Sequence, residues 1–177
     1  MRKTTPKRSL RIAVALALLA LPLTTVLVTE RTAGSGAEPA SAASTGDKEW
    51  VDFTLPDTSG RQVSLGPFIG KKPVLLVFWA TWCPHCNAAV PEINRFHAEY
   101  SPAGKLQILA LDYKESVEKV NAFIAEKKVS YPVLLDRGGL AARKFRVVGI
   151  PTYILIDREG SVVYRDHDLP EIAKYLK

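Results

Sequence analysis

The chain contains two cysteines, Cys83 and Cys86, which stand three positions apart in the segment Trp82-Cys83-Pro84-His85-Cys86. This segment follows an apolar run and precedes residues whose apolar side chains have helical spacing. On a first helical turn such residues are surface neighbours, so their sulfurs can bond without movement of the backbone. A disulfide that closes so small a loop adds little stability through chain entropy, which disfavours a purely structural role. The pattern therefore predicts a redox-active dithiol.

The two cysteines are expected to differ in role because they occupy different positions on the predicted helix. Cys83 lies where a helix N-terminus presents free N–H groups that stabilise a thiolate, so we expect it to be the nucleophile. Cys86, one turn deeper, is expected to be shielded and to act as the resolving thiol. Pro84 fits the first turn, where a missing N–H has no cost, and stiffens the motif. His85, when protonated, would favour the thiolate and make the disulfide a better oxidant.

Other uses of paired cysteines fit the sequence less well, and the predicted chemistry needs no cofactor beyond the disulfide. A closed zinc site takes four ligands, whereas the chain has two cysteines and three scattered histidines, so no metal site is predicted. Covalent haem attachment needs C-x-x-C-H, and Asn87 occupies the histidine position. Copper(I) on the two thiolates remains an alternative, since soft metal and soft ligands match. A peroxide-reducing enzyme is a weaker alternative, because no P-x-x-x-T-x-x-C pattern surrounds Cys83.

The N-terminal part of the chain is predicted to be a membrane-targeting segment followed by a flexible linker. Residues 1–11 contain five basic residues and no acid, and residues 12–28 form an apolar run. This pattern is typical of a transmembrane anchor or a cleavable signal sequence, and the charged residues directly after the run favour the anchor. Residues 1–11 are then cytoplasmic and the rest of the chain is extracytoplasmic, in a compartment that permits disulfides. Residues 29–47, rich in Ala, Ser, Gly and Thr, are predicted to be a flexible linker.

Residues 48–177 are predicted to form one α/β domain. Their basic residues are scattered among acids, and half of the net charge of +6 belongs to residues 1–47, so no nucleic-acid-binding stripe is expected. The predicted elements are a hairpin of 50–55 and 61–65, a buried strand over 74–79, a helix over 83–100, a strand over 106–111, a helix that begins after Ser116, a strand over 133–135, a helix over 140–145, a hairpin of 152–156 and 162–164, and a final helix over 169–176 with Asp168 and Glu171 as a capping box. Strands that alternate with helices predict a central mixed sheet with helices on both faces. The cysteines would lie at the carboxyl end of a central strand, where open α/β sheets place their sites.

Three segments in this order resemble the membrane-anchored TlpA/ResA type of thioredoxin-fold thiol-disulfide oxidoreductases. They are Phe78-Trp79-Ala80-Thr81-Trp82-Cys83-Pro84-His85-Cys86, Tyr131-Pro132-Val133-Leu134-Leu135-Asp136 and Gly149-Ile150-Pro151-Thr152-Tyr153-Ile154-Leu155-Ile156-Asp157. The resemblance implies a thioredoxin-like fold with an added N-terminal β-hairpin. It also implies that Pro151 is a cis-proline opposite the disulfide and that Ile150 offers its backbone to an extended substrate segment, since an exposed backbone edge can pair with a peptide of any sequence. Trp82 is expected to line this site.

The resemblance also implies substrates and partners. Expected substrates are extracytoplasmic protein thiols and disulfides, including apocytochrome c cysteines that await haem, and a membrane electron carrier would reset the dithiol. The scaffold favours a reductase, whereas the dipeptide Pro84-His85 is that of the oxidase DsbA. A DsbA-like thiol oxidase is therefore the alternative.

The chain departs at two positions from the proteins that it resembles. Thioredoxin has a buried aspartate where this chain has Val77, and many ResA-like reductases have a glutamate where it has Ala89. Asp112, near the end of a predicted strand on the same edge of the sheet, is a candidate substitute as proton acceptor, although a carboxylate at a strand end is usually solvated. His97 and His167 lack a motif and are expected to be ordinary surface residues.

Overall fold

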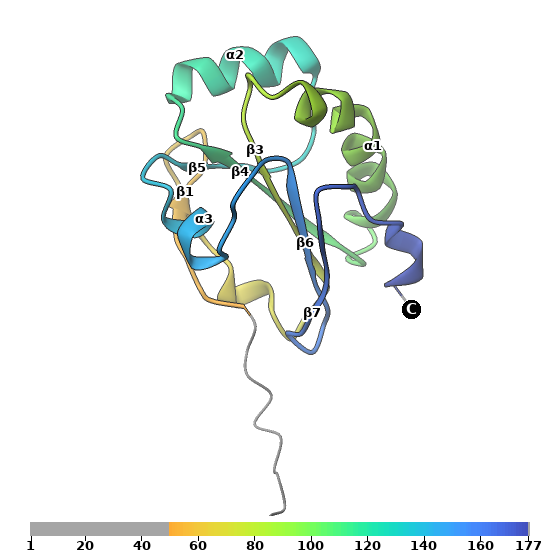
Figure 1. Cartoon of the computed structure of the whole chain (residues 1–177). Helices are drawn as coiled ribbons and strands as arrows, with labels where there is room; N and C mark the ends of the chain where they lie inside the picture. The colour runs from red at the N-terminus through yellow and green to blue at the C-terminus, as the bar shows by residue number, and fades with distance from the viewer. Residues whose placement is uncertain (1–49, 177) are drawn as a thin grey trace, which may run out of the picture. The chain divides into compact units, whose positions relative to one another are not determined.

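The computed structural model describes residues 50–176, so the predicted basic segment, anchor or signal sequence, and linker lie outside the described residues. A five-stranded sheet has the strand order β5-β4-β3-β6-β7, and a separate hairpin consists of β1 and β2 (Figure 1). The elements are β1 (Thr54–Pro56), β2 (Gln62–Ser64), η1 (Gly66–Phe68), β3 (Val74–Trp79), α1 (Pro84–Tyr100), β4 (Gln107–Tyr113), α2 (Val117–Lys127), β5 (Val133–Asp136), α3 (Leu140–Lys144), β6 (Thr152–Ile156), β7 (Val162–Asp166) and η2 (Ile172–Lys174). The predicted mixed sheet, flanking helices and N-terminal hairpin are confirmed.

Strand β3 occupies the centre of the sheet because all of its residues are apolar. Each of its six residues is buried, as expected for a strand covered on both faces. It pairs in parallel with β4 and antiparallel with β6, which makes the sheet mixed. The carboxyl end of β3 leads through a short loop into α1. The two cysteines therefore stand at the end of a central strand, as predicted.

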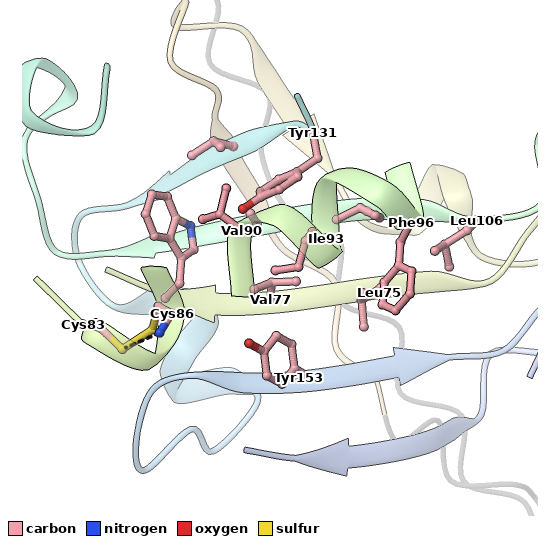
Figure 2. Packing of buried hydrophobic residues seen from close by; sticks show 14 of the residues in the cluster. Leu75, Val77, Cys83, Cys86, Val90, Ile93, Phe96, Leu106, Tyr131 and Tyr153 are labelled. Atoms are coloured by element: carbon pink, nitrogen blue, oxygen red, sulfur yellow. Dashed lines mark hydrogen bonds between the residues drawn. A yellow bond between two sulfur atoms is a disulfide. The ribbon is translucent and has the colours of Figure 1, made fainter. Parts of the chain in front are cut away.

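Different elements cover the two faces of the sheet. Helices α1 and α2 and the turn η2 pack on one face, and their buried residues include Cys86, Val90, Ile93, Phe96, Val120, Phe123 and Ile172. Figure 2 shows this cluster, with the disulfide at one end of it. The hairpin and α3 pack on the other face, through Phe53, Leu55, Ala141 and Ala142 with Phe145. Figure 1 shows α1 and α3 on opposite sides of β3 and β6.

Side chains cap both long helices at their N-termini. The sulfur of Cys83 accepts a hydrogen bond from the N–H of Cys86 at 3.2 Å, and Pro84 follows as the first helical residue. The hydroxyl of Ser116 accepts one from the N–H of Lys119 at 3.4 Å. Each cap satisfies a backbone donor that has no partner within the helix.

The C-terminal segment differs from the prediction. In place of a helix over 169–176 there is one 3₁₀ turn, and Asp168 and Glu171 form no capping box. The carboxylate of Glu171 instead pairs with Lys174 at 2.8 Å. A segment this short closes few helical hydrogen bonds, so the burial of Ile172, which is 1% exposed, determines its position.

Among residues 50–176, no helix has the combination of length and apolar character that a membrane crossing requires.

Candidate active site

Cys83 and Cys86 form a disulfide at the start of α1, and their Cα atoms lie 5.3 Å apart (Figure 2). Cys86 is shielded, at 4% exposed, but Cys83 is equally buried at 3%. Exposure therefore does not distinguish the two cysteines in the oxidised state. Their positions on the helix do distinguish them, because the sulfur of Cys83 faces the free N–H groups of the first turn and accepts a hydrogen bond from one of them. A thiolate at Cys83 would receive more stabilisation from the helix than one at Cys86.

The loop before β6 lies at the same end of the sheet as the disulfide. Thr152, the first residue of β6, pairs with Phe78 near the end of β3, and the Ile150–Pro151 peptide bond is cis. The hydroxyl of Thr152 donates a hydrogen bond to the carbonyl of Gly149 at 2.6 Å, which fixes the loop internally. Within residues 50–176, neither the N–H nor the carbonyl of Ile150 has a hydrogen-bond partner. This backbone edge is available to another chain.

Two cavities meet at Ile150. The cavity of about 300 Å³ is lined by Trp82, Tyr113, Val147, Val148, Gly149 and Ile150. The other, of about 510 Å³, contains Ile150 and Pro151 together with His85 and His167 in its wall. Trp82 is 59% exposed, which is unusual for the largest side chain. Trp82 and His85, which flank Cys83 and Pro84, thus each line one of the two cavities next to the free backbone of Ile150.

The chain has relatives among known proteins. A family model described as the AhpC/TSA family matches residues 47–165. The thiol-disulfide oxidoreductase ResA of Bacillus thuringiensis subsp. konkukian (strain 97-27) is 33% identical over 133 residues, which cover 73% of this chain and 76% of ResA. The chain belongs to the AhpC/TSA family. It is a thiol-disulfide oxidoreductase of the ResA type.

Solved structures of related proteins have the same fold. A candidate protein disulfide isomerase from Bacteroides thetaiotaomicron is 34% identical, with a TM-score of 0.64 over 71% of this chain and 82% of that one. A candidate thiol:disulfide interchange protein DsbE from Chlorobium tepidum is 32% identical, with a TM-score of 0.62 over 70% of this chain and 86% of that one. The thioredoxin-like fold of this AhpC/TSA family member is therefore confirmed.

Asp112 of this oxidoreductase is not a solvated carboxylate, and that expectation was wrong. Strand β4 continues to Tyr113, so Asp112 lies inside the strand, pairs with Trp79 and is 0% exposed. Its Oδ2 accepts a hydrogen bond from the N–H of Glu115 at 3.1 Å, whereas its Oδ1 has no partner among the described residues. Burial, together with the neighbouring carboxylate of Glu115, raises the pKa of Asp112 to about 8.

Glu115 connects Asp112 to the loop that precedes Cys83. Its carboxylate accepts hydrogen bonds from the N–H of Thr81 at 2.6 Å and from the Thr81 hydroxyl at 2.8 Å. Its Oε1 also pairs with the Nζ of Lys119 at 2.5 Å. Burial opposes ionisation here, but the hydrogen bonds from Lys119 and Thr81 outweigh it and lower the pKa of Glu115. Glu115 is thus an anion held between α2 and the active-site loop, and no sequence motif marked it.

His167 also belongs to the site, although it was expected to be an ordinary surface residue. It is exposed, but its Nδ1 lies 2.6 Å from the carbonyl oxygen of Pro151. Since a carbonyl oxygen only accepts, Nδ1 carries the proton and donates it. The sequence signal was indirect: His167 directly follows β7, whose antiparallel pairing with β6 returns the chain to the cis-proline loop. His97, by contrast, lies in α1 near Ser130.

The two positions at which the resemblance led us to look for acids are apolar in this oxidoreductase. Val77 is 2% exposed and packs in the cluster that contains both cysteines, and Ala89 packs against that cluster. Among residues 50–176, no group of three or more His, Cys, Asp or Glu residues could hold a metal ion.

The raised pKa of Asp112 predicts that Asp112→Asn stabilises the oxidised protein at alkaline pH. The folded state keeps this proton up to about pH 8, whereas an unfolded aspartate releases it near about pH 4, so stability falls between these values. The neutral isostere Asn avoids that loss. We expect the Tm of the variant to match the wild type at about pH 4 and to exceed it by about 3 °C or more at about pH 8, measured by thermal unfolding.

Glu118→Gln is the matched control, because Glu118 is exposed in the first turn of α2. It should give no gain in Tm at alkaline pH. An Asp112→Asn variant that is no more stable than the wild type at alkaline pH would show that Asp112 is already ionised in the folded protein.

Proposed function

We propose that the chain is an extracytoplasmic protein-disulfide reductase in which Cys83 is the nucleophile and Cys86 the resolving thiol. The observation that carries this proposal is the position of the Cys83–Cys86 disulfide, at a helix N-terminus and at the same end of the sheet as the free backbone of Ile150. Exchange with a protein disulfide needs two parts. One is a nucleophile that the helix stabilises, and the other is a strand-like edge that can hold a peptide.

Reduction proceeds through a mixed disulfide. The Cys83 thiolate attacks one sulfur of the substrate disulfide, and the other substrate sulfur leaves as a thiolate. The Cys86 thiol then loses its proton and attacks the sulfur of Cys83, which releases the second substrate thiolate. Two electrons have passed from the dithiol to the substrate, and Cys83 and Cys86 are again joined. No cofactor besides this disulfide takes part in the step.

The substrate segment binds in extended form along the cis-proline loop. The free N–H and carbonyl of Ile150 support this mode, because they can pair with any peptide backbone. The side chains on either side of the substrate cysteine enter the two cavities that adjoin Ile150, where Trp82 and His85 contact them. Pro151 has no N–H to donate and its carbonyl already accepts from His167, so the backbone groups that this loop offers to a peptide are those of Ile150.

The proposed location rests on the sequence of the segments outside the described residues, and the proposed partners rest on the similarity to ResA-type oxidoreductases. We propose that residues 1–11 are cytoplasmic, that residues 12–28 anchor the chain and that residues 29–47 tether a domain formed by residues 48–177 outside the membrane. A signal sequence that is cleaved is the alternative. The proposed substrates are extracytoplasmic protein disulfides, including those of apocytochrome c, and a membrane electron carrier restores the dithiol.

A DsbA-like oxidase is the second candidate function, and His85 is the observation that favours it. This residue directly follows Pro84, is exposed and lines the cavity next to Ile150. A protonated imidazole beside Cys83 stabilises the reduced thiolate and so makes the disulfide more oxidising. The same steps would then run in the opposite direction.

Trapping of substrates tests the two roles. Cys86→Ser should hold substrates on Cys83 as stable mixed disulfides, because the resolving attack is lost, whereas Cys83→Ser should trap none. The measurement is non-reducing electrophoresis of the full-length variants after reaction with a disulfide-containing protein. Equal trapping by both variants would contradict the assigned roles.

The role of His85 is tested by the reduction potential. His85→Ala should lower the potential by roughly 30 mV, which corresponds to a tenfold change in the exchange equilibrium, because stabilisation of the reduced thiolate is removed. The measurement is equilibration with glutathione buffers. His97→Ala, which changes a histidine on α1 beside Ser130, should leave the potential unchanged, and a potential that stays constant or rises in His85→Ala would refute the tuning role.

A further inference from the structure

The resolving step needs a proton acceptor, and the apolar side chains beside the cysteines do not provide one. Cys86 attacks as a thiolate, so its thiol must lose a proton first. Val77 lies in the cluster that contains both cysteines and Ala89 packs against it, and neither side chain can bind a proton. Another group must therefore take up this proton, or the step depends on ionisation of the thiol into solvent.

Asp112 lies on the face of the sheet that carries Cys86. Along β4, Ile108 and Ala110 pack in the cluster that contains both cysteines, and alternation places Asp112 next on that face. Its register partner on β3, Trp79, belongs to the same cluster and immediately precedes the active-site loop. Asp112 thus stands at the end of the sheet where the disulfide stands, below the surface and not in solvent.

The surroundings of Asp112 favour a retained proton. It is 0% exposed, and its Oδ1 has no hydrogen-bond partner among the residues that the structure describes. The charged groups that act on it are Glu115, which raises its pKa, and Lys119, which lowers it and is bound to Glu115. The apolar side chains that β3 and α2 contribute to the cluster on this face include Trp79, Val120 and Phe123. Two adjoining carboxyl groups with one cation nearby share a proton in preference to both being ionised.

We propose that Asp112, supported by Glu115, is the group that takes the proton from Cys86 when the mixed disulfide is resolved and returns it when the disulfide is opened. This proposal rests on the roles proposed above for Cys83 and Cys86. In resolution the S–H bond of Cys86 breaks, its proton passes to the Asp112 carboxylate, and the sulfur electron pair forms the bond to Cys83. The substrate sulfur leaves with the electrons of the mixed disulfide. In the opposite direction, protonated Asp112 supplies the proton that the departing Cys86 sulfur takes up.

The proton affinity of Asp112 is close to that of an ordinary cysteine thiol. The pKa of Asp112 is raised to about 8, and an ordinary cysteine thiol has a pKa of about 8.5. Transfer between groups of similar affinity costs little in either direction, which suits a reversible exchange reaction.

Glu115 adds a structural link, because the carboxylate that acts on Asp112 also holds the N–H and hydroxyl of Thr81, two residues before Cys83.

The test separates attack from resolution in one experiment. The reduced full-length protein is mixed with one equivalent of dithionitrobenzoate, and thionitrobenzoate release is followed by stopped-flow absorbance. Attack by Cys83 releases the first equivalent, and resolution by Cys86 releases the second. Asp112→Asn should leave the first phase unchanged and slow the second at least about tenfold at about pH 8, where about half of the Asp112 carboxyl groups are ionised and can take the proton, with the difference closing well above about pH 9, where the thiol ionises unaided.

The controls distinguish this proposal from the one on which it rests. Glu118→Gln, an exposed carboxylate on α2, should leave both phases unchanged. A second phase that is unchanged in Asp112→Asn, or slowed equally at every pH, would overturn the role of Asp112 and leave the cysteine assignments intact. Loss of the first phase in the wild type would overturn those assignments and this proposal together.

A measurement on the wild type does not depend on the folding of any variant. NMR titration of the aspartate carboxyl carbons should show one buried carboxyl that titrates near about pH 8 in the oxidised protein. The midpoint pH of this titration should shift when the disulfide is reduced, because protonation of the carboxyl group is coupled to the state of the Cys86 sulfur. An Asp112 carboxyl that titrates below about pH 5 in both states would overturn the proposal.

Discussion

The hydrogen bond from the N–H of Cys86 to the sulfur of Cys83 is the interaction on which the site depends. It makes a cysteine the N-cap of α1, so the residue that begins the helix is also the residue that reacts. The free N–H groups of the first turn then stabilise the thiolate, and the three-residue spacing brings the second sulfur within bonding distance. Because Pro84 follows directly, the helix begins at this point with no unpaired donor at its first position.

The sheet brings the other parts of the site to the same end. Strand β3 ends at the cysteine loop, its parallel neighbour β4 ends at Asp112 and Tyr113, and its antiparallel neighbour β6 begins after the cis-proline loop. The reacting sulfurs, a buried carboxyl group and a free backbone edge therefore come from three adjacent strands. This arrangement relies on the complete burial of β3, which fixes the register of both neighbours.

The features that local patterns determine could be predicted from sequence. The continuous apolar run of β3, the helix that starts at the cysteine pair and the helix that begins after Ser116 each depend on a few neighbouring residues, and the structure has them where the sequence placed them. Features that depend on distant parts of the chain were not predictable in the same way. Asp112 is buried beside Trp79 of β3 and accepts a hydrogen bond from Glu115, and His167 reaches Pro151 through the pairing of β6 with β7. The prediction of a C-terminal helix was wrong for the same reason, since the packing of Ile172 outweighed the helical propensity of the segment.

The equilibrium of the full-length protein with glutathione buffers tests the central claim most directly, because it asks whether the Cys83–Cys86 bond opens and closes at all. The account predicts reversible exchange with a midpoint near that of thioredoxin, about −270 mV, as suits a reductase. A midpoint near about −120 mV would reverse the proposed direction. A disulfide that exchanged with neither glutathione nor a stronger dithiol would contradict the account, because the bond would then be a structural link between neighbouring residues.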